Sequence, residues 1–298
     1  MIKQLLPEKI FTYLNNVNFN NVNEVRLRLN TPILFNVKGE NYFLTTSGLS
    51  LNSENAIYTK QSMIDFVLQK ASNNSLYTIN DQLINGYVSY GAVRIGVCGE
   101  LVMVNGKIKT IKNINALNIR IPHFIKNCSL PIYKLLVTDQ VKNTLIVSPP
   151  GAGKTTFIRD LAYQISNKEK TVNILIADER CEITGILDSE ILTNVDVYKN
   201  CTKEYAFTCG IRSMKPNVII TDEIDINKDI NIIEEAMCSG VKVIATIHAN
   251  NLLDLKNKKA FNDILNKQLF ERFVVLSAEN GYGTIEGVYN ENMRCIYA

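Results

Sequence analysis

The chain has 298 residues and is predicted to form an α/β fold, a mostly parallel sheet with helices on both faces, preceded by a smaller α+β domain. Two patterns predict this. Short alternating strand patterns with turn signals fill the chain to about residue 135. Continuous apolar runs of strand length then alternate with helical patterns, as is typical of parallel strands buried on both faces. We therefore expect an N-terminal α+β domain at 1–135 and the α/β domain at 136–298.

In the first domain, alternation of apolar and polar residues predicts antiparallel strands, and two dipeptides predict the turns between them. Strand patterns lie at 24–45 and 85–111, a helical pattern at 59–72, and a proline-bounded linker or edge segment at 121–131. Lys38-Gly39 is a turn signal within the first strand region. Asn105-Gly106 is a hairpin signal, because both residues tolerate positive φ.

In the second domain, buried strands and helices are expected to follow one another. The predicted order is strand 143–148, helix 154–166, strand 171–178, strand 217–223, helix 230–240, and strands 241–248, 271–278, 283–290 and 293–298. Gly240 is expected to cap the helix before it. This alternation favours a sheet whose loops at the carboxyl ends of the strands hold the functional residues.

Composition excludes several classes of protein. The hydrophobic fraction of 46% and the charged fraction of 20% are those of a globular protein. The formal net charge of +3 is too small to indicate a polyanionic partner, although it leaves room for a local basic face. The seven cysteines form no C-x-x-C pair and, without a signal peptide, indicate reduced thiols in a cytoplasm. No apolar run is long enough to span a membrane, so any membrane association is expected to be peripheral.

The loop after strand 143–148 has the pattern of a phosphate-binding loop. Its sequence SPPGAGKTT matches G-x-x-x-x-G-K-[ST], except that Ser148 takes the first position. Glycines let backbone amides approach phosphate oxygens, and the helix N-terminus adds its positive end. Lys154 is expected to contact the β- and γ-phosphates, and the Thr155 hydroxyl to bind magnesium. The expected nucleotide-binding residues are Pro150, Gly151, Ala152, Gly153, Lys154, Thr155 and Thr156.

Two adjacent carboxylates, Asp222 and Glu223, end the buried strand 217–223. Asp222 is suited to the magnesium shell through water, and Glu223 to orienting and deprotonating the attacking water. An acidic strand end that faces solvent is the structural alternative. Two acids at this place favour hydrolysis over binding alone.

Several further polar residues have two interpretations each. Thr246 and His248, at the end of strand 241–248, either sense the γ-phosphate or are structural. Glu179 is either a second catalytic acid or part of a salt-bridged strand end. Arg212 either reaches a neighbouring subunit's nucleotide or pairs with a local acid.

Four arginines of the first domain lie in strand patterns. They are Arg26, Arg28, Arg94 and Arg120. Each alone is best interpreted as part of a solvated strand face, and together they are able to supply charge to a phosphate across a domain interface. A nucleic-acid patch is the further alternative, but the segments lack the basic-aromatic interleaving of single-strand binders.

Motifs along nearly the whole chain resemble those of the stage III sporulation protein AA family. They are EVRLRLNTPILF, YGAVRIGVCGE, NIRIP, LIVSPPGAGKTTFIRDLA, ADERCEITG, IRSMKPNVIITDEI, GVKVIAT and FERFVVLSAENGYGTIEGVY. This family comprises ATPases of endospore-forming bacteria that are similar to type II and type IV secretion ATPases. The resemblance implies a RecA-like P-loop core that binds ATP and Mg²⁺, and assembly into a homo-oligomeric, hexameric ring. It also implies a cytoplasmic place in the mother cell, peripheral to the membrane that faces the forespore, beside membrane proteins of a channel complex.

The resemblance also carries residue roles onto matching positions. It assigns Lys154 and Thr155 to nucleotide and magnesium, and raises the expectation that His248 is functional. It makes Arg120 and Arg212 candidates for donating charge to the γ-phosphate. The chain departs from the general pattern at Ser148, where Pro149-Pro150 are expected to impose the tight turn. It departs again in IDINKDINI after Glu223, which lacks the glycine and arginine often found there.

The sequence therefore predicts an ATP-hydrolysing motor of a sporulation-specific secretion-like or channel-like complex, in which ATP drives domain motion within a ring. Nucleic acid is not expected as a partner. Two alternatives remain open: a RecA-fold ATPase stimulated by nucleic acid, and a nucleotide-gated scaffold that binds ATP without hydrolysing it.

Overall fold

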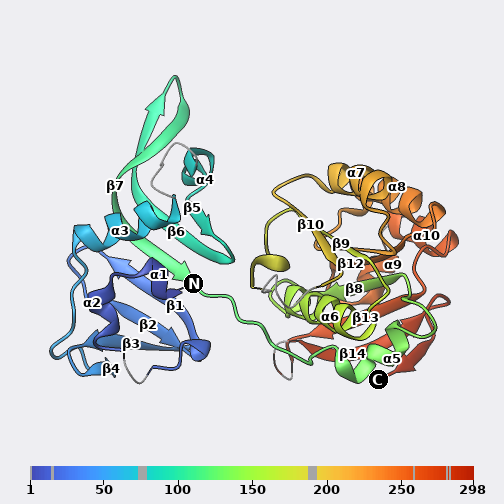
Figure 1. Cartoon of the computed structure of the whole chain (residues 1–298), viewed down its shortest axis with the longest axis horizontal. Coiled ribbons are helices and arrows are strands. Elements are labelled where there is room, and N and C mark those ends of the chain that lie inside the picture. Colours follow the sequence, from blue (N-terminus) through green and yellow to red (C-terminus); the bar gives the residue numbers. More distant parts are fainter. Residues whose placement is uncertain are drawn as a thin grey trace. The chain divides into compact units, whose positions relative to one another are not determined.

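The computed structural model describes residues 2–14, 17–72, 79–186, 193–257, 259–279, 281 and 283–298. Contacts between Cα atoms divide the chain into two compact units, Met1–His123 and Phe124–Ala298 (Figure 1). Each unit has its own sheet and its own hydrophobic core. The two units are described separately below.

The first unit is built on a seven-stranded antiparallel sheet. In spatial order its strands are β4 (Gly48–Ser50), β3 (Glu40–Thr45), β2 (Leu34–Val37), β1 (Val22–Arg28), β7 (Lys107–Arg120), β6 (Val93–Val104) and β5 (Tyr87–Tyr90). Its helices are α1 (Ile2–Leu5), α2 (Glu8–Phe11), α3 (Gln61–Ala71) and α4 (Asn80–Ile84). Val25 and Phe35 from the strands share one buried cluster with Ile64 and Val67 from α3.

Both predicted turns of this unit are confirmed. Lys38 and Gly39 join β2 to β3 with φ of +51° and +93°. Asn105 and Gly106 join β6 to β7 with φ of +52° and +74°. Positive φ at both central residues matches the right-handed twist of the flanking strands, so these dipeptides set the hairpin register.

The second unit is a mixed sheet of eight strands, covered by helices on both faces. In spatial order the strands are β10 (Val195–Lys199), β9 (Ile174–Asp178), β11 (Val218–Thr221), β12 (Lys242–His248), β8 (Thr144–Ser148), β13 (Arg272–Ser277), β14 (Thr284–Asn290) and β15 (Cys295–Tyr297). The helices are α5 (Tyr133–Leu136), α6 (Lys154–Lys168), α7 (Lys203–Met214), α8 (Ile226–Cys238), α9 (Leu252–Lys256) and α10 (Lys259–Asn266). Neighbouring strands from β10 to β13 pair in parallel, and β14 and β15 add antiparallel pairs at one edge.

Successive residues of the central strands face two different cores. Leu145 and Val147 of β8 lie in one cluster with Phe207 of α7, whereas Ile146 lies in the other with Phe157 of α6. A strand buried on both faces needs apolar side chains at nearly every position, which is why the sequence of β8 is a nearly continuous run of apolar residues. The predicted fold class is confirmed.

The structure differs from the prediction in several elements of this unit, because strand β10 and helices α5, α7, α9 and α10 were not predicted. The sequence analysis did not predict helix α7, although Thr202 caps it by accepting a hydrogen bond from the Tyr205 amide. Helix α8 begins at Ile226 rather than at residue 230, because the Asp225 side chain caps it by accepting from the Asn227 amide.

Residues 124–135 pack with the second unit rather than with the first. The buried Asp160 carboxylate of α6 accepts hydrogen bonds from the Asn127 and Ser129 amides, both at 2.8 Å. Ile132 is fully buried in the cluster that contains Phe157. The contact-based division therefore comes before residue 135, where the sequence analysis placed the domain boundary.

Among the described helices, none has both the length and the hydrophobicity to cross a bilayer.

Two glycines of β6 give a matched test of the packing of the long hairpin. A Cβ added at Gly99 would lie 2.7 Å from the Lys112 carbonyl oxygen, whereas one at Gly96 would have no neighbour closer than 3.7 Å. We expect Gly99→Ala to lower the free energy of unfolding of the first unit by about 1–3 kcal/mol through overpacking. Gly96→Ala is expected to change it by much less. Urea unfolding of both variants measures the difference, and equal stabilities would contradict the close approach.

Candidate active site

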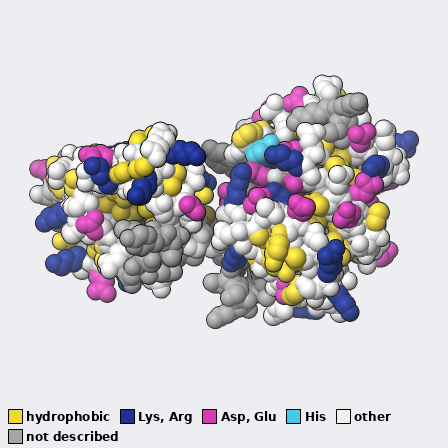
Figure 2. Space-filling view, turned by 90° about the horizontal axis from the view of Figure 1, so that it is seen from above, with side chains coloured by type: hydrophobic (Ala, Val, Ile, Leu, Met, Phe, Trp, Pro, Cys, Tyr) yellow, Lys and Arg dark blue, Asp and Glu magenta, His cyan; other side chains and the backbone are white. Residues whose placement is uncertain are grey.

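The polar candidates of the second unit meet where the carboxyl ends of β8, β12, β11 and β9 form one edge of the sheet. Strand β12 lies between β8, which leads into the phosphate loop, and β11, which leads into the acid pair. The side chains of Thr246 and His248, at the end of β12, therefore lie between the loop and the acids. Figure 2 shows acidic and basic side chains intermixed around a histidine on the visible face of this unit.

The loop between β8 and α6 has the backbone of a phosphate cradle. Gly151 and Gly153 have φ of +77° and +94°, values that favour glycine. The Ala152 amide donates to the Pro149 carbonyl at 3.3 Å, which closes the turn beside Ser148. No side chain caps the helix at Gly153, so the first-turn amides are available to an anion. A Cβ built at Gly151 meets nothing within 4 Å, so its conformation, not space, requires glycine.

The first turn of α6 contacts the acid pair directly. Thr155 Oγ1 donates to Asp222 Oδ2 at 2.6 Å. The other oxygen of Asp222 accepts from the buried Thr246 hydroxyl. Thr156 follows in the same turn. The structure thus brings the predicted magnesium residues, Thr155 and Asp222, together.

Glu223 is the centre of the cluster. Its Oε1 accepts from Lys154 Nζ at 2.8 Å and lies 2.9 Å from His248 Nε2, and its Oε2 accepts from Arg180 Nη1 at 2.6 Å. The backbone of Glu223 has φ of +50°, the left-handed region that costs a residue with a Cβ about 1–2 kcal/mol. Its amide donates to Thr246 Oγ1 at 2.8 Å, which holds this conformation.

The protonation of Glu223 follows from these partners. Burial alone would raise the pKa of the carboxyl, but the hydrogen bond and charge of Lys154, with His248 and Arg180, outweigh burial and lower the pKa to about 2. The carboxyl is therefore ionised at neutral pH. With Lys154 in place it is also a weak base, because each donor stabilises the charged form.

The turn after β9 is held by a buried carboxylate. Asp178 accepts hydrogen bonds from the amides of residues 182, 183 and 184 and from the Thr184 hydroxyl, at 2.7–3.2 Å. Arg159 of α6 donates to the carbonyls of Glu182 and Ile183. The turn is thereby tied to the helix that carries the phosphate loop.

Of the other sequence candidates, Glu179 lines a small cavity together with Asp222 and Glu223. Glu179 pairs with Lys203 Nζ at 2.7 Å, the salt-bridged arrangement that was one of its two interpretations. Arg212 is exposed and lies nine residues after Lys203, about 14 Å further along α7. It therefore does not join the phosphate loop of its own chain. Arg120 ends β7 in the first unit, where its charge helps to lower the pKa of Glu24. The roles of these three residues stay predictions.

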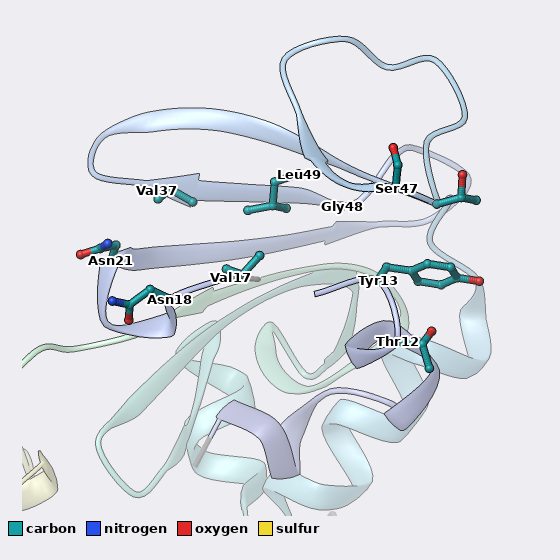
Figure 3. A pocket seen from close by; sticks show the side chains of 10 residues that line it. Thr12, Tyr13, Val17, Asn18, Asn21, Val37, Ser47, Gly48 and Leu49 are labelled. Atoms are coloured by element: carbon teal, nitrogen blue, oxygen red, sulfur yellow. The ribbon is translucent and has the colours of Figure 1, made fainter. Parts of the chain in front are cut away.

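The first unit has a cavity whose lining differs chemically from the charged cluster around Glu223. It has a volume of about 570 Å³ and lies between the segment before β1 and the strands β2 to β4 (Figure 3). Asn18, Asn21, Ser47 and Tyr13 supply its polar groups, and the lining residues that the structure describes include no charged side chain. A site for a polyanion needs cations or a helix N-terminus, so this cavity is not the nucleotide site.

The donor set at the sheet edge fits magnesium. Among the described residues, no group of three or more His, Cys, Asp and Glu side chains is placed to hold a metal ion. A magnesium ion bound by Thr155 and Asp222 would therefore take its other ligands from water and phosphate oxygens. Mg²⁺ commonly binds in this way, through one or two protein ligands plus substrate phosphates.

A comparison with known protein families identifies the chain. A family model described as "Sporulation stage III, protein AA" matches residues 1–296. The chain belongs to this family. It is 32% identical over 302 residues to stage III sporulation protein AA of Bacillus subtilis (strain 168), and the match covers 98% of this chain and 95% of that relative.

Solved structures show the same fold. The Legionella pneumophila ATPase DotB superposes with a TM-score of 0.55 at 14% identity, covering 86% of this chain and 72% of that one. The pilus retraction motor PilT, solved with bound ADP, superposes with a TM-score of 0.56 at 16% identity, covering 85% and 74%. At these identities the likeness shows the fold alone, which is RecA-like.

The sequence analysis did not select two basic residues that the structure brings to the site. Arg180 was not selected as a site residue, yet its guanidinium contacts Glu223. Arg159 was not considered, because an arginine on the helix after a phosphate loop has no pattern of its own. A signal for Arg180 was present: it follows Asp178 and Glu179 at a strand end, on the edge where ligands bind.

The low pKa of Glu223 predicts how its contribution to stability depends on pH. A carboxyl whose pKa is lowered from 4.5 to about 2 on folding stabilises the fold fully above pH 4.5, and the contribution is lost as pH falls through about 2. We expect Glu223→Gln to unfold at a lower temperature than the parent protein at pH 7. The gap between the two unfolding midpoints is expected to narrow below pH 4.5. Thermal unfolding midpoints from pH 7 to pH 3 measure this gap.

The exposed Glu54, which makes no ion pair among the described residues, provides the control. Glu54→Gln is expected to keep the parent midpoint throughout the range. A gap for Glu223→Gln that stays constant from pH 7 to pH 3 would contradict the ion-pair assignment.

Proposed function

We propose that the chain hydrolyses ATP and that this hydrolysis drives domain motion in a ring-shaped motor of a sporulation-specific complex. The observation that carries the proposal is the contact between the phosphate loop and the acid pair. Lys154 contacts Glu223, and Thr155 contacts Asp222, at 2.8 Å and 2.6 Å. A loop that only bound phosphate would need no acid within hydrogen-bond distance of its lysine.

Binding of ATP changes the partners of Lys154. The loop amides and the N-terminus of α6 attract the triphosphate, and Lys154 exchanges the Glu223 carboxylate for β- and γ-phosphate oxygens. Lys154 is only 7% exposed, so it has few alternatives to these two partners. When Lys154 leaves Glu223, the basicity of the Glu223 carboxylate rises, and at that moment the substrate is in place.

The chemical step then uses Glu223 as the base. A water oxygen forms a bond to the γ-phosphorus while the bond from that phosphorus to the β,γ-bridging oxygen breaks, which releases ADP. The proton of the water passes to the Glu223 carboxylate. Thr246 holds the Glu223 backbone, and His248 restricts the carboxylate from the other side. Magnesium, when bound by Thr155 and Asp222, neutralises charge on the phosphate oxygens.

Assembly into a ring, of six subunits, is the second part of the proposal. Arg212 is exposed in the last turn of α7, about 14 Å along the helix from Lys203, and we propose that it serves a neighbour. Arginines supplied in trans raise phosphoryl-transfer rates about 10³–10⁵-fold. The rate per subunit is therefore expected to rise steeply with protein concentration. PilT is named as a pilus retraction motor, and a motor with the same fold agrees with this proposal.

The family name supports a role for this motor in sporulation. We propose that the ring acts in the mother cell, at the cytoplasmic side of a channel complex whose membrane proteins are its partners. Acidic and basic side chains are intermixed on the face of the second unit seen in Figure 2, without the one-sided basic patch typical of nucleic-acid binding.

Substitution of the base tests the proposal directly. Glu223→Gln is expected to bind ATP with little loss while turnover falls about 10²-fold or more, because only the group that accepts the proton is changed. A phosphate-release assay and a fluorescent ATP analogue measure the two properties. Turnover that equals that of the parent protein would show that Glu223 is not the base.

Lys154→Ala is the contrasting variant, because it removes a phosphate ligand and is expected to weaken triphosphate binding itself.

Stimulation of the parent protein by DNA or RNA would favour the nucleic-acid alternative. ATP binding without phosphate release at any protein concentration would favour the gated scaffold.

A further inference from the structure

Arg180 is a cation at the active site whose position the turn after β9 determines. Its Nη1 donates to Glu223 Oε2 at 2.6 Å, on the oxygen that Lys154 does not use. One carboxylate therefore bridges the phosphate-loop lysine and this arginine. A γ-phosphate that draws Lys154 away from Glu223 also comes next to Arg180.

The backbone of the turn that carries Arg180 is held by hydrogen bonds. The Asp178 carboxylate precedes it and accepts three amides and one hydroxyl from the residues that follow. Cys181, directly after the arginine, has φ of +56°, a left-handed conformation that turns the chain sharply. Arg159 of α6 binds the carbonyls at the end of the turn. Movement of the Arg180 backbone would break this buried network.

The Arg180 side chain, in contrast, is free to exchange partners. It is 64% exposed, and Glu223 is its ion-pair partner among the described residues. A guanidinium offers paired donors that match phosphate as well as carboxylate oxygens, and phosphate carries more negative charge. A fixed backbone with a mobile cationic end is what a sensor of the γ-phosphate requires.

We propose that Arg180 contacts the γ-phosphate of ATP bound to its own chain and gives the isolated chain a basal hydrolysis rate. This inference rests on the proposed ATPase function. Arg212 lies too far along α7 to serve this purpose within one chain, so the two arginines divide the work: Arg180 acts in cis, and Arg212 acts across the ring. P-loop GTPases with an arginine in cis hydrolyse faster unassisted than those that wait for one in trans.

The test compares Arg180→Ala, Arg180→Lys and Arg294→Ala in the full chain at the lowest protein concentration that gives a measurable rate. Arg294 is an exposed arginine at the opposite edge of the sheet and is the matched control. We expect Arg180→Ala to lower the basal rate at least about 10-fold. Arg180→Lys is expected to lie in between, and Arg294→Ala to keep the parent rate.

A binding measurement separates this role from a structural one. Only the triphosphate has a γ-phosphate, so Arg180→Ala is expected to weaken a non-hydrolysable ATP analogue about 10-fold relative to ADP. Parent-like hydrolysis by Arg180→Ala, or equal weakening of analogue and ADP, would overturn the inference while leaving the proposed function intact. A parent protein that releases no phosphate at any concentration would overturn both.

Discussion

The ion pair between Lys154 and Glu223 is the interaction on which the site depends. A buried ammonium and a largely buried carboxylate satisfy each other at 2.8 Å, so neither can act until a stronger partner displaces it. A triphosphate is such a partner for the lysine. In the proposed function, the same contact that stabilises the chain without nucleotide withholds the base, and substrate binding releases it. Hydrolysis in this account is coupled to occupancy of the loop without any large rearrangement of the backbone.

Strand order places these groups together. Because β12 lies between β8 and β11, the residues at its end hold the acid pair from one side while the phosphate loop faces it from the other. Helix α6 extends the connection beyond the site. Its first turn carries Lys154, and further along Arg159 binds the turn that presents Arg180, while Asp160 binds the segment that begins at residue 124. One helix thus contacts the loop between β8 and α6, the turn after β9 and the start of the second unit.

The sequence predicted the fold class and the residues whose chemistry has a local pattern. Lys154, Thr155, Asp222 and Glu223 follow strands directly, so their meeting at one sheet edge could be foreseen from parallel topology. Arg180 also follows a strand, but its contact with Glu223 could not be foreseen, because that contact depends on a turn built by the Asp178 carboxylate and a left-handed Cys181. Helix α7 was not predicted because its buried face is short. The place of residues 124–135 could not be foreseen, because it depends on tertiary contacts, the Asp160 carboxylate and the burial of Ile132.

The central claim is that a triphosphate separates Lys154 from Glu223. A crystal structure with a non-hydrolysable ATP analogue and magnesium tests it most directly. The account predicts the analogue's phosphates on the loop amides, Lys154 Nζ on the β- and γ-phosphate oxygens, and a Glu223 carboxylate facing the γ-phosphate without its lysine. A structure in which the analogue is bound while Lys154 still contacts Glu223, or in which both acids turn away from the phosphates, would contradict the account.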